Sequence, residues 1–380
     1  MKGRCNMVDY EGPRCIEEYE LPELINLLNL VFRSDGGDMA SDYPRHVAMS
    51  NRENVRIIKM GGKIVAHVAT SVRPVNLSGI QTYEAGIGAV ATHADARGLR
   101  LASVLMQDAV ERSVEQGADI MLISGDLGVY RRMHAVDCGR FNQVKIDRTY
   151  VEASGDFSIS PAQENHIDDI INLWSTLPTR YILPREDWIA LFDCKTIMDK
   201  PSDWWVVHHD GNLCGMGIIK QEAAELTLQD WAGQTEALQA AASFWFDHYK
   251  NESLTYVPSS ANLLPLNWKK ASQGLRTLYE GTVLVIQAQR FLKRAEALII
   301  ERIGEQAFAD LKIEAQEQSA TFEYKGERLE FQNAGELTHL FFGHPEIDIL
   351  SDRLPHDSPL YKIMSRIFPI PLVWYGVGYV

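Results

Sequence analysis

Apolar residues follow two different spacings in the first third of the chain. Between residues 17 and 33 they recur about every 3.6 positions, which predicts an amphipathic helix. Val55–Met60 and Lys63–Val72 are strand-like and flank Gly61-Gly62, and this arrangement predicts a β-hairpin. The other elements predicted in this region are two strands and a helix, Thr82–Thr92, Ile120–Ile123 and Leu101–Gln116.

The same order of elements returns after residue 151. A helix is predicted from residue 167 to residue 177, and a hairpin is predicted around Asp210-Gly211. A strand over Leu226–Trp231 and a helix over Thr235–Tyr249 come next. Helix, hairpin, strand and helix thus occur twice, and this pattern is equally compatible with an internal duplication and with two unrelated segments.

The last part of the chain has a different pattern and ends on an apolar terminus. Helices are predicted over Gln289–Ile303 and Gly335–Phe342. Three short strands are predicted between them, at Leu311–Ala315, Ala320–Tyr324 and Arg328–Phe331. Residues 368–380 are strongly apolar, whereas loose termini are usually polar. We therefore expect this terminus either to dock on the core or to be held at a site.

Composition and charge exclude several classes of protein. The chain has 380 residues, 46% of them hydrophobic, which suits two or three domains with real cores and excludes a disordered chain. Its 37 basic and 51 acidic residues give a formal net charge of −14, and no basic run is present. We therefore expect no nucleic-acid partner, and the acidic balance favours cationic substrates.

The same composition bears on location. No apolar run approaches about 18 residues, so neither a membrane span nor a membrane partner is expected. No apolar core comes after the first residues, so they do not predict a signal peptide. The five cysteines are sparse and never spaced as CxxC, which is typical of reduced thiols in a cytoplasmic protein. His208-His209 has no accompanying set of spaced ligands, so no metal is expected.

One segment has the strand, loop and helix order that can bind phosphates. Within residues 88–106, the pair Arg97-Gly98 precedes a predicted helix that begins near Leu101. The first N–H groups of a helix are unpaired, and the helix dipole favours an anion there. Arg97 and Arg100 could add charge-assisted contacts. The alternative interpretation is an ordinary solvated loop between a strand and a helix.

The loop sequence resembles that of a known superfamily. Residues 97–102, Arg-Gly-Leu-Arg-Leu-Ala, are similar to the pyrophosphate loop Arg/Gln-x-x-Gly-x-Gly/Ala of the GNAT superfamily of acetyl-CoA-dependent N-acetyltransferases. The first and last positions fit, while Arg100 replaces the central glycine, so its side chain must point away from the phosphates. The resemblance implies acetyl-CoA as co-substrate. It assigns the pyrophosphate site to Arg97, Gly98, Leu99, Arg100, Leu101, Ala102 and Ser103.

A second motif resembles that of a narrower group within this superfamily. Residues 124–132, Ser-Gly-Asp-Leu-Gly-Val-Tyr-Arg-Arg, are similar to the enhanced-intracellular-survival type of GNAT acetyltransferase. Those proteins have a GNAT domain, a degenerate second GNAT domain and a C-terminal domain like a sterol carrier protein. The resemblance implies an α/β (α+β) chain of mixed, mostly antiparallel sheets flanked by helices, divided at 1–150, 151–285 and 286–380. It also implies a symmetric homo-oligomer.

The same resemblance assigns further residues to the acetyl-CoA site. The backbone of Val90, Ala91 and Thr92, where the strand splays, is expected to pair with pantetheine amides. One N–H group there is expected to bind the thioester oxygen as negative charge develops. The backbone of Asp126 and Leu127 is expected to line the acetyl-CoA site.

The resemblance implies two catalytic groups as well. Tyr130 is expected to give a proton to the departing coenzyme A sulfur. The terminal carboxylate of Val380 is expected to take a proton from the amine or to anchor an ammonium group. The implied acceptor is a primary amine, on a small cationic molecule or a protein lysine, that attacks the thioester directly.

The second copy of the pattern differs at the same junction. Residues 230–236 contain acids and Trp231 but no Arg-Gly pair, so we expect only the first domain to bind acetyl-CoA. An alternative from another class is a non-catalytic protein with degenerate GNAT domains, which binds a ligand or senses acetyl-CoA.

Overall fold

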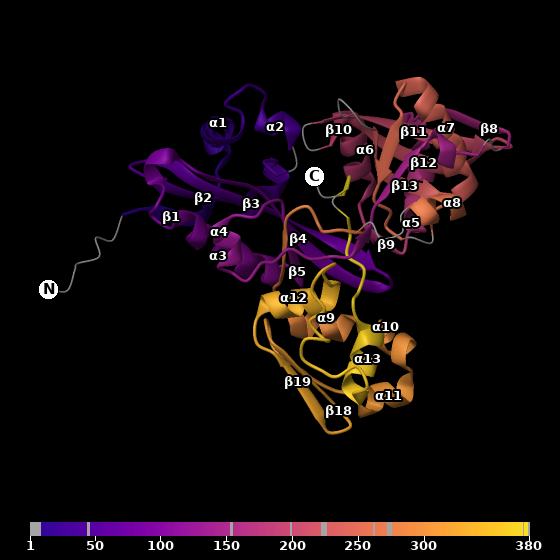
Figure 1. Cartoon of the computed structure of the whole chain (residues 1–380). Coiled ribbons are helices and arrows are strands. Elements are labelled where there is room, and N and C mark those ends of the chain that lie inside the picture. Colours follow the sequence, from indigo (N-terminus) through magenta and orange to yellow (C-terminus); the bar gives the residue numbers. More distant parts are fainter. Residues whose placement is uncertain are drawn as a thin grey trace.

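The computed structural model contains two seven-stranded sheets and a smaller domain with a three-stranded sheet (Figure 1). It describes residues 9–43, 46–152, 155–197, 200–221, 226–260, 263–271, 276–374 and 376–378. Within these ranges, no helix is long and apolar enough to cross a bilayer. The mixed sheets flanked by helices confirm the α/β character of the predicted fold class.

The first sheet has the strand order β1-β2-β3-β4-β5-β16, with β9 paired to β3. Its strands are β1 (Glu11–Cys15), β2 (Val55–Met60), β3 (Lys63–Leu77), β4 (Ile80–Thr92), β5 (Ile120–Ile123), β9 (Thr179–Tyr181) and β16 (Thr282–Val285). Neighbours in this sheet are antiparallel except β4 and β5, which are parallel. The predicted β2–β3 hairpin and the strand β5 are confirmed.

Helices cover both faces of the first sheet because its strands alternate apolar side chains between them. They are α1 (Leu21–Phe32), α2 (Met39–Asp42), α3 (Leu101–Glu115) and α4 (Gly128–Arg131). Ile57 packs in a cluster with Leu24 and Leu28 of α1. The next residue, Ile58, packs on the opposite face in a cluster with Leu105 of α3 and Tyr130 of α4.

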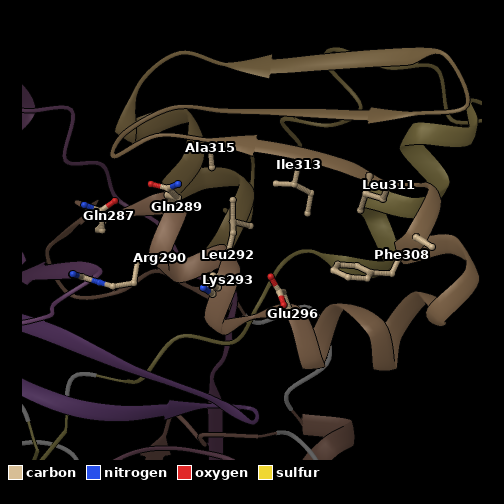
Figure 2. A pocket seen from close by; sticks show the side chains of 11 residues that line it. Gln287, Gln289, Arg290, Leu292, Lys293, Glu296, Phe308, Leu311, Ile313 and Ala315 are labelled. Carbon is tan, nitrogen blue, oxygen red and sulfur yellow. The ribbon is translucent and has the colours of Figure 1, made fainter.

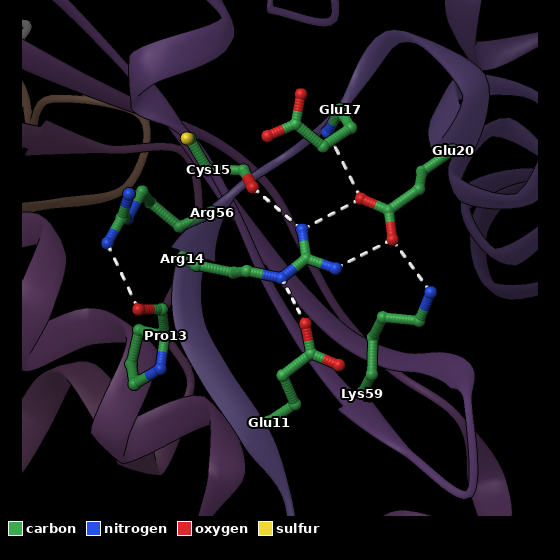
Figure 3. Close-up of polar contacts among 8 residues, drawn as sticks. All are labelled: Glu11, Pro13, Arg14, Cys15, Glu17, Glu20, Arg56 and Lys59. Carbon is green, nitrogen blue, oxygen red and sulfur yellow. Dashed lines mark hydrogen bonds and ion pairs between the residues drawn. The ribbon is translucent and has the colours of Figure 1, made fainter.

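A buried ion cluster ties the start of α1 to the edge of the sheet (Figure 3). Glu20, 1% exposed, accepts from both terminal nitrogens of Arg14, with Nη2 at 2.7 Å and Nη1 at 2.8 Å, and from Lys59 Nζ at 2.7 Å. The hydrogen bonds from Arg14 are the main reason that the pKa of Glu20 falls to about 2. This carboxylate therefore holds β1, β2 and α1 together.

The second sheet repeats the plan of the first, with the order β10-β11-β12-β13-β14-β7 and β8 paired to β11. Its strands are β7 (Val144–Asp147), β8 (Phe157–Pro161), β10 (Thr196–Ile197), β11 (Lys200–His209), β12 (Asn212–Gln221), β13 (Leu226–Gly233) and β14 (Ser253–Tyr256). Its helices are α5 (Ile167–Ser175), α6 (Arg185–Cys194), α7 (Thr235–Tyr249) and α8 (Leu266–Ala271). The predicted repeat of helix, hairpin, strand and helix is present in α5, β11–β12, β13 and α7.

The two sheets exchange strands. β7 comes before residue 150 but pairs with β14 in the second sheet, and β16 comes after residue 151 but pairs with β5 in the first. The crossing chains also pair with each other, as β6 (Phe141–Asn142) and β15 (Arg276–Thr277). No single cut of the chain therefore separates the two sheets.

The third unit packs onto the edge of the first sheet. It contains α9 (Ala288–Arg294), α10 (Glu296–Ile303), α11 (Glu305–Asp310), β17 (Lys312–Ala315), β18 (Ala320–Tyr324), β19 (Glu327–Phe331), α12 (Ala334–Phe342) and α13 (Pro359–Ile367). Asp119, which is fully buried, accepts from Arg290 at 2.5 Å and from Arg294 at 2.6 Å. These buried ion pairs join α9 to the loop that leads into β5.

One predicted helix is wrong. We expected a single helix over Gln289–Ile303, but the chain forms α9 and α10 with a break at Ala295. Both halves pack in the core that also holds α13, through Phe291 of α9 and Ile299 of α10, and only α9 also directs arginines to Asp119. The apolar periodicity is continuous through Ala295, so it does not predict the break.

Candidate active site

β4 bends and separates from β5 at the position where the resemblance places the acetyl-CoA site. Ala91 is opposite His67 and Gly88 is opposite Ala69, so β4 carries one extra residue between them, and Ala89 adopts a positive φ of 50°. The pairing of β4 with β5 stops at Ile87 and Ile123. We call this divergence the first splay. Val90, Ala91 and Thr92 lie beyond it, where β4 has no neighbour on its β5 side among the described residues.

The loop after β4 presents an exposed start of α3. Arg97, Gly98, Leu99 and Arg100 are all exposed, and α3 begins at Leu101. Neither guanidinium in this loop forms an ion pair within the described part of the chain, so both are available to an anion. Leu101 and Ala102 lie in the first turn, where helix N–H groups lack helical acceptors.

Arg100 explains how this chain manages without the glycine of the motif. Its φ of 60° and ψ of 17° are left-handed, the region that glycine adopts without steric cost. Its carbonyl accepts from the N–H groups of Ser103 and Val104, at 3.0 and 3.2 Å, which closes the first turn of α3. A non-glycine residue in this conformation costs about 1–2 kcal/mol. The backbone of Arg100 therefore adopts a conformation that suits glycine, and its exposed side chain extends into solvent.

Tyr130 lies on α4, just beyond the end of β5. It is 4% exposed and shares an apolar cluster with Ile87, Leu101 and Ile123, so the ends of β4 and β5 and the start of α3 converge around it. Its hydroxyl makes no hydrogen bond to the described residues. Burial raises the pKa of Tyr130 to about 12, so the phenol keeps its proton at neutral pH.

The two residues before α4 differ in how their side chains are held. Asp126 pairs with Arg131, which also contacts Asp137 at 2.6 Å, and the Arg131 guanidinium lowers the pKa of Asp126. Leu127 is 58% exposed and precedes the first residue of α4. The side chain of Asp126 is thus engaged inside the chain, and the carbonyl of Leu127 accepts from the N–H groups of Tyr130 and Arg131 in the first turn of α4.

Sequence reasoning missed polar residues on the other face of β4. Arg73 is opposite Glu84 in the β3–β4 register, and both side chains are buried. Gly86 and Gly88 lie on the same face, since every second residue of a strand points to one side. His46 covers Gly88 so closely that a Cβ there would lie 2.6 Å from its ring. An acid directly before the small and apolar run from Ala85 to Ala91 was the signal available in the sequence.

His67 is also buried beside the bulge, opposite Ala91. Its Nδ1 lies 3.1 Å from the carbonyl oxygen of Arg56, which can only accept, so Nδ1 carries the proton. Burial lowers the pKa of His67 to about 4, so the ring is neutral at pH 7. A neutral imidazole whose Nε2 has no hydrogen-bond partner among the described residues therefore lies on the α1 side of the bulge.

The C-terminal chain runs toward this polar face. Phe368, Ile370, Leu372 and Val373 are buried, which confirms that the apolar terminus docks on the core. Arg73 donates a hydrogen bond from Nη1 to the carbonyl of Gly378. The predicted catalytic residue Val380 lies outside the described residues.

One cavity adjoins the site, and a larger groove lies in the third unit. A space of about 370 Å³ adjoins the polar face and is lined by Asn51, Ser71, Arg73 and, from the second domain, Asp187. A larger groove of about 810 Å³ lies in the third unit, between α9, α11 and β17 (Figure 2). The larger groove therefore lies on a different domain from the first splay. Among the described residues, no group of His, Cys, Asp and Glu is arranged to hold a metal.

The sequence of the first domain matches a family model. Residues 13–135 match the model described as acetyltransferase (GNAT) domain. The first domain is thus similar to the GNAT superfamily. A comparison with curated proteins finds no match.

Solved structures share the fold over almost the whole chain. A GCN5-related N-acetyltransferase from Kribbella flavida superposes with a TM-score of 0.66 at 13% identity, covering 96% of this chain and 99% of its own. A probable N-acyltransferase from Enterococcus faecalis gives a TM-score of 0.65 at 14% identity, with the same coverage. Eis1 from Mycobacterium abscessus gives 0.59 at 11% identity, covering 96% and 97%. At these identities the likeness shows the fold.

Proposed function

We propose that the protein is an acetyl-CoA-dependent N-acetyltransferase that moves an acetyl group to a primary amine. The observation that carries the proposal is the meeting of the first splay, the exposed start of α3 and the buried Tyr130 in one cluster. The family match over residues 13–135 covers these same elements. Acyl transfer from a thioester needs a donor for the developing oxyanion, an anchor for the phosphates and a proton for the sulfur, and the cluster offers all three.

Acetyl-CoA fits the residues that line the first splay. We assign its pantetheine arm to the free side of β4 at Val90, Ala91 and Thr92, and the thioester oxygen to an N–H group of the same stretch. The pyrophosphate is assigned to the start of α3 from Gly98 to Ser103, with Arg97 nearby. The free helix N–H groups and the unpaired arginines suit an anion of this size.

Tyr130 is assigned the role of general acid. Collapse of the tetrahedral intermediate breaks the bond between carbon and sulfur, and the leaving thiolate takes a proton. The phenol of Tyr130 is protonated at neutral pH and has no partner among the described residues, so its proton is available. The phenolate that forms regains a proton from solvent after coenzyme A leaves.

The amine is assigned to the polar face of β4, opposite α3. An ammonium has no lone pair, so it must lose a proton before it attacks. We assign that proton to the terminal carboxylate of Val380, because the chain runs as far as Gly378 on Arg73. The acidic balance of the chain favours a small cationic amine or a protein lysine as the acceptor.

The remaining expectations complete the proposal. We assign residues 1–150 to the acetyl-CoA-binding domain, 151–285 to a degenerate second GNAT domain and 286–380 to a sterol-carrier-like domain, with β7 and β16 exchanged between the first two. A homo-oligomer and a cytoplasmic location are part of the same proposal. The described cysteines are all free, as a reducing compartment would leave them.

Calorimetric titration with acetyl-CoA, and then an amine screen, tests this function. We expect micromolar binding at one site per chain and release of coenzyme A when an accepted amine is present. Binding without turnover on any amine would favour an acetyl-CoA sensor. Absence of binding at millimolar acetyl-CoA would exclude the transferase and favour the non-catalytic alternative.

A further inference from the structure

The second domain contains its own version of the splay. β13 and β14 are parallel and pair from Leu226 to Leu228, after which the strands separate. β13 carries an extra residue at Gln229, since Leu228 and Asp230 are opposite consecutive residues of β12. We call this divergence the second splay. It has the parallel pair and the bulge of the first splay, at the corresponding strands.

The C-terminal chain lies in the second splay. Asp230, just past the bulge, accepts a hydrogen bond from the N–H of Val377 at 2.9 Å. Trp374 and Gly376 line a small internal space together with Asp230 and Tyr256, the last residue of β14. Figure 1 shows the yellow C-terminal segment running from the third unit toward the second sheet. The chain's own backbone therefore occupies the place that corresponds to the acetyl-CoA site of the first domain.

Two glycines permit this close approach. A Cβ on Gly376 would lie 2.7 Å from a carboxylate oxygen of Asp230. A Cβ on Gly378 would overlap the ring of Tyr181 on β9. Val377 between them is 1% exposed and belongs to the main core cluster. The sequence Gly-Val-Gly thus fits the narrow space between the carboxylate of Asp230 and the ring of Tyr181.

The segment Gly376–Gly378 is held from both domains. Asp230 of the second sheet binds it at the N–H of Val377, and Arg73 of the first sheet binds it at the carbonyl of Gly378. Arg73 is also opposite Glu84 on the polar face where the amine is assigned. The two contacts therefore hold the backbone in the second splay and direct it toward the candidate active site.

We propose that the second splay is a binding site for the chain's own C-terminal segment, and that Asp230 is the positioning residue that directs this segment to the active-site face of the first domain. The binding itself stands on the contacts above. Its effect on turnover rests on the proposed acetyltransferase function. A domain without its own acetyl-CoA loop would thus serve catalysis by holding a segment of the chain in place.

Hydrogen exchange measured by mass spectrometry tests the binding without any substrate. Asp230→Ala removes the acceptor, so amides of the peptide that contains Val377 should exchange at least about tenfold faster than in the unchanged protein. Asp230→Asn keeps an amide oxygen as acceptor and should restore most of the protection. Asp247→Ala, which removes an exposed acid of α7, is the matched control and should change nothing in this peptide.

A second variant acts from the other side of the contact. Gly376→Ala places a methyl group against the carboxylate without removing a buried side chain, and it should produce the same faster exchange. It remains informative if Asp230→Ala fails to fold. Unchanged exchange in the Val377 peptide of whichever of these variants folds would overturn the proposal.

Kinetics separate the positioning role from a general loss of structure. In Asp230→Ala the turnover number should fall at least about tenfold while the acetyl-CoA dissociation constant stays the same, because the first splay is untouched. Asp230→Asn should recover most of the turnover. If the unchanged protein binds no acetyl-CoA, the proposed function fails, whereas the exchange experiment still decides whether Asp230 holds the segment. Fast exchange with normal turnover would overturn the positioning role.

Discussion

The first and second splays start from the same strand arrangement and differ in the connection that leads to the next helix. In the first domain, residues 93–100 form a loop between β4 and α3 that carries Arg97 and Gly98. In the second, Gln234 alone separates β13 from α7. A pyrophosphate needs room and positive charge before the helix, and only the longer loop provides them. The same scaffold therefore yields a candidate ligand site in one copy and an internal packing site in the other.

The second difference between the two splays is a single acidic residue, Asp230. Asp230 projects into the second splay, whereas the corresponding stretch of β4, Ala89 to Ala91, has only small apolar side chains. A carboxylate at this point repels phosphate and thioester oxygens but accepts a backbone N–H well. The short connection before α7 and the acid at position 230 thus together distinguish the second splay from the first.

The largest effect that we expect is a loss of turnover, and it arises at the first splay alone. Tyr130→Phe removes the phenol next to the first splay and should lower turnover by about a hundredfold or more, because proton transfer to sulfur is lost. Acetyl-CoA affinity in calorimetry should stay within about twofold, since the ring remains. Tyr83→Phe, at an exposed position of β4, is the control. Normal turnover in Tyr130→Phe would exclude Tyr130 from the mechanism. It would also remove this functional difference between the first and second splays.

The next effect concerns how each copy holds its first helix. Glu20 anchors α1 through Arg14 and Lys59. The contacts at the start of α5 are exposed instead: the N–H of Gln163 donates to His166, and Asp168 pairs with Arg185. The pKa of Glu20 is lowered from 4.5 to about 2, so its stabilisation is fully present above pH 4.5 and is lost as the pH falls toward 2.

Glu20→Gln should therefore lower the free energy of unfolding at pH 7 by about 2–3 kcal/mol. Chemical denaturation at several pH values should show the gap between variant and unchanged protein closing below pH 4.5. The corresponding change Gln163→Ala in the second domain should cost less than about 1 kcal/mol. Equal costs at the two sites would contradict the difference in anchoring.

The positive charge of Arg97 in the loop before α3 gives a third test. Arg97→Ala should weaken acetyl-CoA binding about tenfold, because one charge-assisted phosphate contact is lost. Arg185→Ala at the start of α6 removes an exposed arginine of the second domain and should leave the dissociation constant unchanged. Unaltered binding in Arg97→Ala would place that side chain away from the phosphates.

The second splay should also affect how stability depends on pH. Burial raises the pKa of Asp230 from 3.8 to about 7, so between these values the folded protein holds a proton that the unfolded chain has released. The free energy of unfolding therefore falls as the pH rises from about 4 to 7 through this group. Asp230→Asn cannot ionise, so thermal unfolding at pH 5 and pH 8 should show a smaller difference than in the unchanged protein. An unchanged difference would contradict a neutral Asp230 below pH 7.

The smallest expected effect concerns backbone strain at the two loops. Arg100 and Lys250 both adopt left-handed conformations, with φ of 60° and 58°. Replacing either with glycine should raise the free energy of unfolding by up to about 1 kcal/mol, because the steric penalty disappears. Only Arg100→Gly lies at the pyrophosphate loop, so it alone should change acetyl-CoA affinity. An effect of Lys250→Gly on that affinity would contradict the separation of the two domains.

Several elements could be predicted because their information is local. The hairpin at Gly61-Gly62, the strand Ile120–Ile123 and the helix Thr235–Tyr249 are present with the predicted bounds or close to them. Each depends on the periodicity of one short segment and on its turn residues. The loop motif of residues 97–102 is local in the same sense, and it predicted a ligand site in the region where the first splay lies.

The missed features depend on how segments pair. The exchange of β7 and β16 joins residues far apart in sequence, and Glu84 comes opposite Arg73 only through the register of the β3–β4 hairpin. The break at Ala295 interrupts a segment whose apolar spacing is continuous. Periodicity says which face of a segment is apolar, but not which other segment covers it.

The sequence by itself determined the repeated order of elements, the phosphate-type loop of the first copy and the absence of that loop from the second. Local spacing and residue type are sufficient for these features. Only the tertiary structure decided that the second splay holds Gly376–Gly378, and that Arg73 and Asp230 bind this segment from two domains. The physical reason is that a half-buried acid and a pair of glycines acquire a role only through the backbone that approaches them, and that approach is set by packing of the whole chain.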